Sequence, residues 1–376
     1  MLALRRATRL ALALLLAAAV APGACKPHDE TSPTRPAPPA ERPVVVDVHV
    51  HLSPNGVSRL LGLMRRYGFD HVVNLSGGTP LRGLDVQLEA ARRSGDRISV
   101  FTTLAYEQAE HEGYGARMAE LVRQAHRMGA RGLKIAKVLG LGLPGPDGKL
   151  LPVDDPGLDP VFEAAGALGM PVAIHAGDPK AFWDPAQPSN ERFAELKAHP
   201  GWALHGEKVP SFHEILDQLE RRIARHPKTK FISVHFGNDA EEPDRVARML
   251  RQYPNLYIDT AARIPELGRH PPAKMRDFYL EFQDRVLYGS DLGVGPEGTP
   301  LFLGSEGENP PTAREQELFF SATKRYFETA DQSFEHPTPI QGNWKISGVN
   351  LPRPVLEKIY AKNAMRLLGL KVERIK

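Results

Sequence analysis

The sequence is poor in cysteine, since Cys25 is the only one among its 376 residues. No intrachain disulfide can form, so the fold must depend on an apolar core or on a bound metal. It also lacks an apolar run long enough to cross a bilayer, because Leu10–Val20 is shorter than the roughly 20 residues that a spanning helix needs.

An excess of one charge sign is also missing, because the formal net charge of the whole chain is only +3. Loss of Arg5, Arg6 and Arg9 with an N-terminal signal would lower this charge to zero. A neutral chain gives no electrostatic support for a nucleic-acid partner. The expected partner is therefore a small-molecule substrate, and the sequence leaves the oligomeric state open.

The first residues have the pattern of an export signal. Three arginines precede the apolar run, and the small residues Ala21, Gly23 and Ala24 follow it, which predicts a signal peptide over residues 1–24. Cys25 comes next, as in a bacterial lipobox, although Pro22 stands where that motif prefers leucine. The chain is therefore expected to be exported in a bacterium, either membrane-tethered through a lipid on Cys25 or soluble in the periplasm.

Residues 25–42 are rich in proline and charge and read as an extended tether, so the folded domain is expected over residues 43–376. In that domain, short apolar or β-branched segments alternate with segments of helical periodicity. The predicted strands are Val44–Val50, His71–Leu75, Ile98–Leu104, Gly132–Val138, Pro171–His175, Phe231–Phe236, Leu256–Asp259 and Arg285–Tyr288. The clearest predicted helices are Gly115–Met128, Asp159–Leu168, Phe212–Arg225 and Asp244–Gln252.

This alternation predicts an α/β fold, a single-domain (β/α)8 barrel of the TIM type. An open doubly wound sheet is the alternative, but no glycine-rich phosphate loop follows the first strand. The connections after the fifth and eighth strands, residues 176–208 and 293–347, are too long for simple barrel loops and are expected to shape a substrate pocket.

Candidate metal ligands stand at the ends of the predicted strands. The first strand contains Asp47-Val-His49-Val-His51, where the two-residue period of a strand places the two imidazoles on one side. Two histidines one pleat apart can chelate a divalent ion. His175, His235 and Asp291 each follow another apolar run, and catalytic residues of such barrels lie at these strand ends.

These motifs resemble those of the amidohydrolase superfamily, in its amidohydrolase-related branch of metal-dependent hydrolases, decarboxylases and hydratases. The resemblance extends over residues 44–370 and rests on DVHVH, GLKIAK, IHAGD, VHFGN, LYGSD and IYAKNAMRLLGL. It implies a distorted (β/α)8 barrel. It also implies that His49, His51, His175 and Asp291 hold a divalent metal, that Asp291 also transfers protons, and that His235 binds the metal or acts beside it.

Lys134 bears on the number of ions, because a lysine on the fourth strand is carboxylated in some members of the superfamily and bridges two metals. The branch implied here favours one ion over two, with Lys134 contacting the substrate or pairing with a carboxylate such as Asp47. The mixed nitrogen and oxygen ligands favour zinc, although manganese, iron or cobalt also fit.

The leading functional hypothesis is a hydrolase that acts on a small carbonyl compound, an amide or a lactone, through a metal-activated water. Trp183, Arg192 and Arg263, in the long loops near the strand ends, are candidate substrate-binding residues. A decarboxylase or hydratase using the same ligands is the alternative. A lipoprotein that binds a metal or ligand without catalysis is the third hypothesis.

Overall fold

The structure is a computed structural model, and it describes residues 42–375. The predicted signal peptide, Cys25 and all but the last residue of the predicted tether lie outside the described residues. Within residues 42–375, no helix is long and apolar enough to cross a membrane.

Eight parallel strands form the wall of a barrel, and each lies beside the next in chain order. All eight strands predicted from the sequence are present. They are β1 (Val46–Leu52), β2 (His71–Asn74), β3 (Ile98–Thr103), β4 (Gly132–Ile135), β5 (Val172–Ile174), β6 (Phe231–Ser233), β7 (Leu256–Asp259) and β8 (Val286–Leu287).

The barrel closes between its last strand and its first. The chain continues from β8 into β9 (Leu292–Val294), which pairs in parallel with β1. Backbone hydrogen bonds from Val48 N to Tyr288 O (3.0 Å) and from Asp291 N to His49 O (2.9 Å) complete the junction. The short β10 (Phe302–Leu303) then adds an antiparallel strand beside β9.

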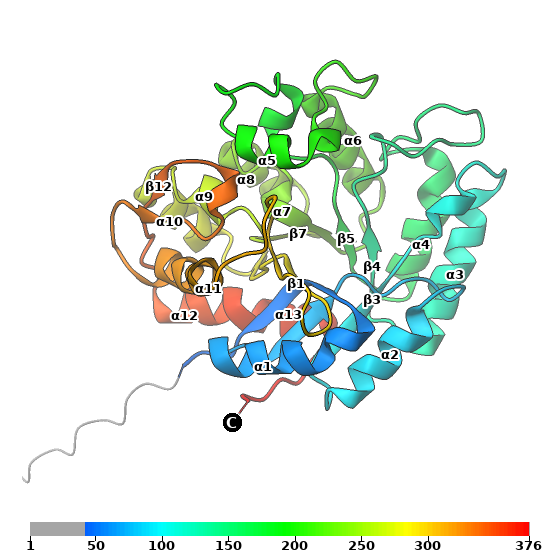
Figure 1. Cartoon of the computed structure of the whole chain (residues 1–376). Helices are drawn as coiled ribbons and strands as arrows, with labels where there is room; N and C mark the ends of the chain where they lie inside the picture. Colours follow the sequence, from blue (N-terminus) through cyan, green and yellow to red (C-terminus); the bar gives the residue numbers. More distant parts are fainter. Residues whose placement is uncertain (1–41, 376) are drawn as a thin grey trace, which may run out of the picture. The chain divides into compact units, whose positions relative to one another are not determined.

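Helices surround the strands, as Figure 1 shows. The helices of the wall are α1 (Val57–Tyr67), α2 (Leu84–Arg93), α3 (Tyr114–Met128), α4 (Asp159–Ala167), α6 (Phe212–Arg225), α8 (Pro243–Gln252) and α10 (Pro272–Glu281). Their amphipathic sequences bury one face; Leu60 and Met64 of α1, for example, are almost fully inaccessible. The four helices predicted most clearly from the sequence correspond to α3, α4, α6 and α8.

The C-terminal helices pack against apolar side chains of the strands. This segment comprises α12 (Arg353–Glu357), a π-helical stretch (Lys358–Lys362) and α13 (Asn363–Leu368). Ala361, Ala364 and Leu368 belong to one buried cluster with strand residues such as Val46 and Phe101. Asn363 donates to the carbonyls of Gln283 and Val286 and so joins this segment to β8.

The two long connections fold into structure of their own. Residues 176–208 contain the short helix α5 (Phe193–Ala198). The connection after β9 contains β10, the helix α11 (Ala313–Glu328) and a two-stranded sheet of β11 (Phe334–Glu335) and β12 (Lys345–Ile346). Two one-turn helices, α7 (Val234–Gly237) and α9 (Ile264–Leu267), follow β6 and β7. The predicted TIM-type barrel with long connections after strands 5 and 8 is therefore confirmed.

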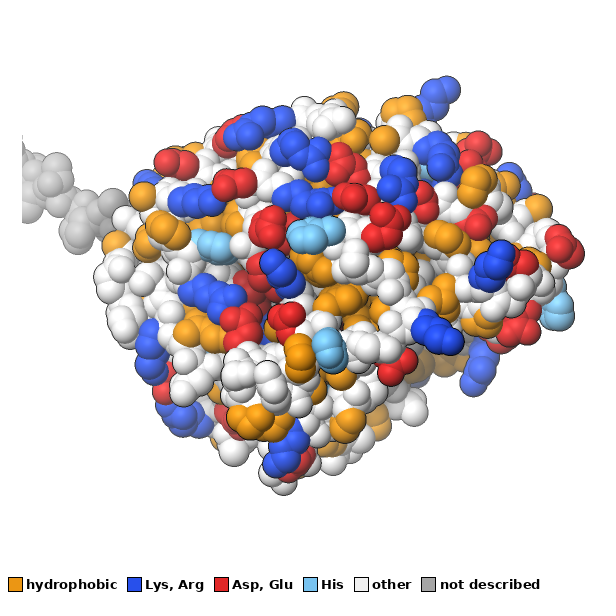
Figure 2. Space-filling view, turned by 90° about the horizontal axis from the view of Figure 1, so that it is seen from above, with side chains coloured by type: hydrophobic (Ala, Val, Ile, Leu, Met, Phe, Trp, Pro, Cys, Tyr) orange, Lys and Arg blue, Asp and Glu red, His pale blue; other side chains and the backbone are white. Residues whose placement is uncertain are grey.

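Acidic and basic side chains are interspersed over the face drawn in Figure 2. That face carries no broad region of one charge sign, in agreement with the small net charge of the sequence.

Candidate active site

The histidines of β1 meet Asp291 at the junction that closes the barrel. Asp291 Oδ1 lies 3.4 Å from His49 Nε2 and 3.3 Å from His51 Nε2. Asp291 has a φ of 66°, in the left-handed region that L-residues rarely adopt. Its N–H donates to His49 O, so the same backbone contact that joins β1 to the β8–β9 segment also positions this carboxylate.

His175 and His235 bring two more imidazoles to this point. The His235 ring centroid lies 4.4 Å from that of His175 and 4.8 Å from that of His49. The four histidines come from β1 and from the residues that follow β5 and β6. All the ligands expected from the sequence are therefore clustered, although His235 lies beyond the end of its strand.

His235 begins a left-handed turn rather than continuing β6. Residues 235–238 all have positive φ, with values of 55°, 57°, 74° and 59°. Left-handed backbone costs roughly 1–2 kcal/mol for each residue other than glycine, so tertiary contacts must stabilise the turn. His235 N donates to Asp259 Oδ1 at 2.7 Å, and Asn238 Oδ1 accepts from Ala176 N at 3.1 Å.

Three of the imidazoles have their Nδ1 atoms engaged. His49 Nδ1 lies 2.9 Å from Asp259 Oδ2, and His235 Nδ1 lies 2.9 Å from the carbonyl oxygen of Ala261. Because these oxygens only accept, both histidines carry the proton on Nδ1 and present the lone pair of Nε2 when neutral. His51 Nδ1 lies 2.7 Å from the Ser76 hydroxyl oxygen. The other ring nitrogen of His51, Nε2, therefore faces Asp291.

The surroundings of the site favour neutral rings at His49, His175 and His235 and an ionised Asp291. Burial lowers the pKa values of His49, His175 and His235 below the ordinary value. Burial alone would raise the pKa of Asp291, but the surrounding histidines, His49 first among them, hold that pKa well below its usual range. Neutral imidazoles and an ionised carboxylate are the protonation states that metal ligands require.

The donor atoms fit a divalent metal. His49 Nε2 and His175 Nε2 are buried and have no hydrogen-bond partner among the described residues. His49, His51 and Asp291 also form one of two groups whose ligand atoms are close enough to share an ion; the other is His49, His235 and Asp259. In the second group Asp259 contacts Nδ1 of His49, and this is how a carboxylate orients a metal-binding imidazole.

Lys134 of β4 faces the same centre. Its side chain is 5% exposed, and no described residue accepts a hydrogen bond from Nζ. Burial lowers the pKa of Lys134 to about 8, against the opposing effect of Asp259 and Asp291. The ion pair with Asp47 considered above is not formed, because Asp47 accepts hydrogen bonds from the backbone and hydroxyl of Ser290.

A cavity of about 440 Å³ opens above these residues. His51, Lys134, His175, His235 and Asp291 line it. The rest of its wall comes mainly from the loops that follow the strands. Among these residues are Lys137, Asp178, Phe182, Glu195, Trp202, Arg263 and Phe302.

The three candidate substrate-binding residues have different positions. Arg263 lines the cavity. Arg192 is fully buried and forms ion pairs with Glu195 and Glu266. Trp183 donates from its indole N–H to the Pro210 carbonyl at 2.9 Å. The tryptophan of the cavity wall is Trp202, which has no sequence motif to mark it.

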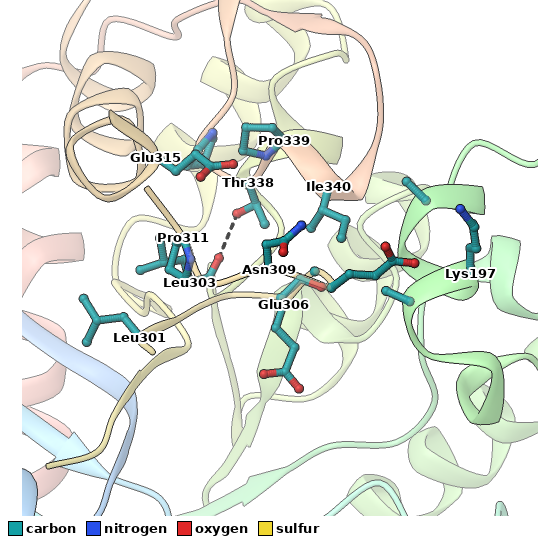
Figure 3. A pocket seen from close by; sticks show the side chains of 16 residues that line it. Lys197, Leu301, Leu303, Glu306, Asn309, Pro311, Glu315, Thr338, Pro339 and Ile340 are labelled. Carbon is teal, nitrogen blue, oxygen red and sulfur yellow. Dashed lines mark hydrogen bonds between the residues drawn. The ribbon is translucent and has the colours of Figure 1, made fainter. Parts of the chain in front are cut away.

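A second cavity, of about 370 Å³, shares Ser305 with the first. Figure 3 shows it between the segment that carries Leu301–Pro311 and the segment that carries Thr338–Ile340, with Lys197 of α5 at its edge. The Thr338 hydroxyl donates to the Leu303 carbonyl at 3.1 Å and joins the two segments.

Asp259 is the residue whose importance was hardest to see in the sequence. It is the last residue of β7, a position at which an aspartate often only caps the loop that follows. The folded barrel brings His49 and His235 beside Asp259. Only there is it evident that the Asp259 carboxylate contacts His49 Nδ1 and accepts from His235 N.

Comparison with known proteins identifies the family of the chain. A family model described as amidohydrolase matches residues 46–370. The chain belongs to the amidohydrolase family. The match covers every strand of the barrel and all five of the expected ligand and proton-transfer residues.

Solved structures agree with this membership at the level of the fold. An uncharacterised TIM-barrel protein from Bordetella bronchiseptica has 13% identity and a TM-score of 0.53, over 86% of this chain and 98% of that one. A dihydroxybenzoic acid decarboxylase from Polaromonas sp., solved with manganese and 2-nitroresorcinol, has 15% identity and a TM-score of 0.52, over 88% and 98%. No curated protein matches the sequence.

This member of the amidohydrolase family is thus an enzyme of a family that uses divalent metals. Its described residues include a candidate centre for such an ion.

Proposed function

We propose that this amidohydrolase is a hydrolase that opens a small carbonyl compound, an amide or a lactone, with a water molecule as nucleophile. The observation that carries the proposal is the meeting of His49, His51 and Asp291 Oδ1 beneath an accessible cavity. A carboxylate at that place can take a proton from water and pass it to a leaving group.

His49, His51, His175 and Asp291 would hold one divalent ion, with zinc favoured by this nitrogen and oxygen donor set. When bound, such an ion acidifies water and polarises a carbonyl group. Asp291 is ionised at neutral pH and is the proton acceptor. It can then donate the proton to the departing nitrogen or oxygen of the substrate.

Lys134 and His235 would act on the substrate itself. His235 donates through Nδ1 to Ala261, so its neutral ring offers an acceptor at Nε2 and no donor to the cavity. Lys134 lines the cavity, and no described residue accepts a hydrogen bond from its Nζ. We assign Lys134 to the carbonyl oxygen, where a positive charge stabilises the negative charge that develops during attack.

Product analysis tests the proposal. Zinc-loaded protein is incubated in ¹⁸O-labelled water with a panel of lactones, amides and aromatic carboxylic acids, and the products are identified by mass spectrometry. We expect one labelled oxygen in the product of a lactone or amide and no such product with Asp291→Asn. Release of carbon dioxide without labelled product would instead favour the decarboxylase alternative.

Metal analysis tests the centre separately. The purified protein is loaded with zinc, desalted and compared with a His49→Ala/His51→Ala double variant by elemental analysis. We expect about one equivalent in the wild-type protein and its loss in the variant. Equal metal content in both proteins would contradict the assigned ligands.

A further inference from the structure

Arg263 is a buried cation whose charge is not matched by a close carboxylate. It precedes α9, is 7% exposed and lines the cavity. One guanidinium nitrogen donates to the Ala262 carbonyl at 3.0 Å. Within the described part of the chain, no carboxylate lies within 4.0 Å of its nitrogens. A guanidinium has five N–H donors, so most of its hydrogen-bonding capacity is available to a ligand.

Glu241, Asp178 and Glu195 are the carboxylates whose charges act on Arg263, and none of them forms an ion pair with it. Glu241 accepts from the backbone N–H of Lys180 at 3.1 Å. Asp178 pairs with Lys137 at 2.8 Å. Glu195 and Glu266 both pair with Arg192, and Glu195 also accepts from the Ser305 hydroxyl. Breaking any of these buried pairs to satisfy Arg263 would leave another cation unpaired.

The charges around the cavity also favour an anion. Three basic side chains line it, Lys134, Lys137 and Arg263, and so do three acidic ones, Asp178, Glu195 and Asp291. These six charges balance, and the Asp259 carboxylate beside His49 adds one negative charge behind them. A divalent ion at the histidines would still leave an excess of one positive charge. An anionic substrate would neutralise this excess.

The remaining wall is suited to a flat apolar body. Phe182, Trp202 and Phe302 line the cavity, and Lys137 lies over the Trp202 ring at 5.1 Å from its centroid. Aromatic side chains recognise rings and hydrocarbon surfaces, and a few convergent polar groups then fix the orientation of a small ligand.

We infer that Arg263 binds a carboxylate group of the substrate, and that this group serves recognition and remains in the product. The inference rests on the proposed function and narrows it to amides or lactones that carry an acid group beside an apolar ring or chain. Because an arginine can bind both oxygens of a carboxylate at once, it would also fix the position of the reacting carbonyl.

The test compares two ligands of nearly equal shape, benzoate and benzamide, by titration calorimetry. Zinc-loaded wild-type protein is expected to bind benzoate roughly 10- to 100-fold more tightly, as a charged hydrogen-bonded pair allows. Arg263→Met is expected to abolish this preference. Arg269→Met is the matched control, because Arg269 lies in the same connection and pairs at the surface with Glu191; it should keep the preference.

The metal could attract benzoate too, so the same titrations are repeated after removal of zinc by a chelator. Retention of the preference in metal-free protein, with its loss in Arg263→Met, supports the inference. If the preference disappears with the metal but persists in zinc-loaded Arg263→Met, the carboxylate binds the metal and the inference is overturned. If Arg263→Met does not fold, Arg263→Gln takes its place, because glutamine keeps two N–H donors without the charge. A full preference for benzoate in Arg263→Gln would also overturn the inference.

These measurements do not depend on turnover. If the lactones and amides are not hydrolysed, a preference for benzoate that depends on Arg263 still supports the inference. If they are hydrolysed but benzoate binds no better than benzamide, hydrolysis stands and the anionic substrate class is wrong.

Discussion

The Asp259 carboxylate lies 2.9 Å from His49 Nδ1, although 210 residues separate the two in the chain. Its other oxygen accepts from His235 N at 2.7 Å and from Ala261 N at 3.1 Å. One buried carboxylate thus fixes the ring of a β1 ligand and the left-handed turn after β6. The geometry of the candidate metal centre therefore depends on a side chain that need not touch a bound ion.

Replacement of this carboxylate should weaken metal binding. Asp259→Asn can donate to His49 as well as accept from it, so the preferred orientation of the ring is lost. We expect metal affinity to fall roughly 10- to 100-fold, the usual effect of removing such a partner. Competition with a chromophoric chelator measures it. Asp277→Asn, at an exposed position of α10, is the control, and equal affinities in the two variants would contradict the assigned role.

Asp291→Asn should separate proton transfer from metal binding. The amide keeps an oxygen for the ion but cannot accept a proton, so we expect turnover to fall about 100- to 10,000-fold. Metal content should fall only in part, because three histidines remain. Steady-state kinetics and elemental analysis on the same preparation give both values. Near-normal turnover would show that another group transfers the proton.

Lys134→Met should reduce activity and leave the metal content unchanged. The variant removes the donor assigned to the carbonyl oxygen, so we expect kcat to fall at least about tenfold while one ion is retained. Lys137→Met, which removes a positive charge from the same cavity, should also retain its metal. About two equivalents in the wild-type protein, reduced in Lys134→Met alone, would instead make Lys134 a bridge between two ions.

Asp239 should make the folded state less stable as pH rises. Burial raises its pKa from 3.8 to about 7, and Arg245 Nε lies 4.0 Å away. Between these values the unfolded chain is ionised and the folded chain is protonated, so stability falls with rising pH and levels off above about 7. The full difference corresponds to at most roughly 4 kcal/mol.

Urea unfolding at pH 5 and pH 8 measures this effect. Asp239→Asn should be more stable than the wild-type protein at pH 8 and closer to it at pH 5, because the amide stays neutral. Asp244→Asn, at a largely exposed position that pairs with Lys274, should show no such dependence. An Asp239→Asn variant that parallels the wild-type protein at both pH values would show that Asp239 is ionised in the folded state.

Export and lipidation remain predictions from the first 25 residues. Expression in a bacterium with a clickable fatty acid should label the wild-type protein and leave Cys25→Ser unlabelled, since the thiol is the acceptor. Absence of label from a protein that lacks residues 1–24 would identify the soluble periplasmic form. Retention of residues 1–24 would contradict export by this route.

The sequence alone determined the barrel and most of its catalytic face. Short apolar or β-branched runs that alternate with helical segments predict buried strands from local sequence, so eight strands and the histidines near their ends could be found without tertiary information. Parallel strands then bring their ends together, and for that reason His49, His175 and Asp291 converge as expected.

Tertiary structure decided what local pattern cannot encode. The run Phe231–Phe236 predicts a strand to its end, yet β6 ends at Ser233 and Asp259 holds His235 at the start of a left-handed turn. Arg192 and Arg263 also look alike in the sequence. Arg192 pairs with Glu195, three residues along the chain, and with Glu266 from a distant loop, whereas Arg263 faces the cavity. Whether a buried arginine forms an ion pair depends on which carboxylates lie beside it in the folded chain, and local sequence does not encode those neighbours.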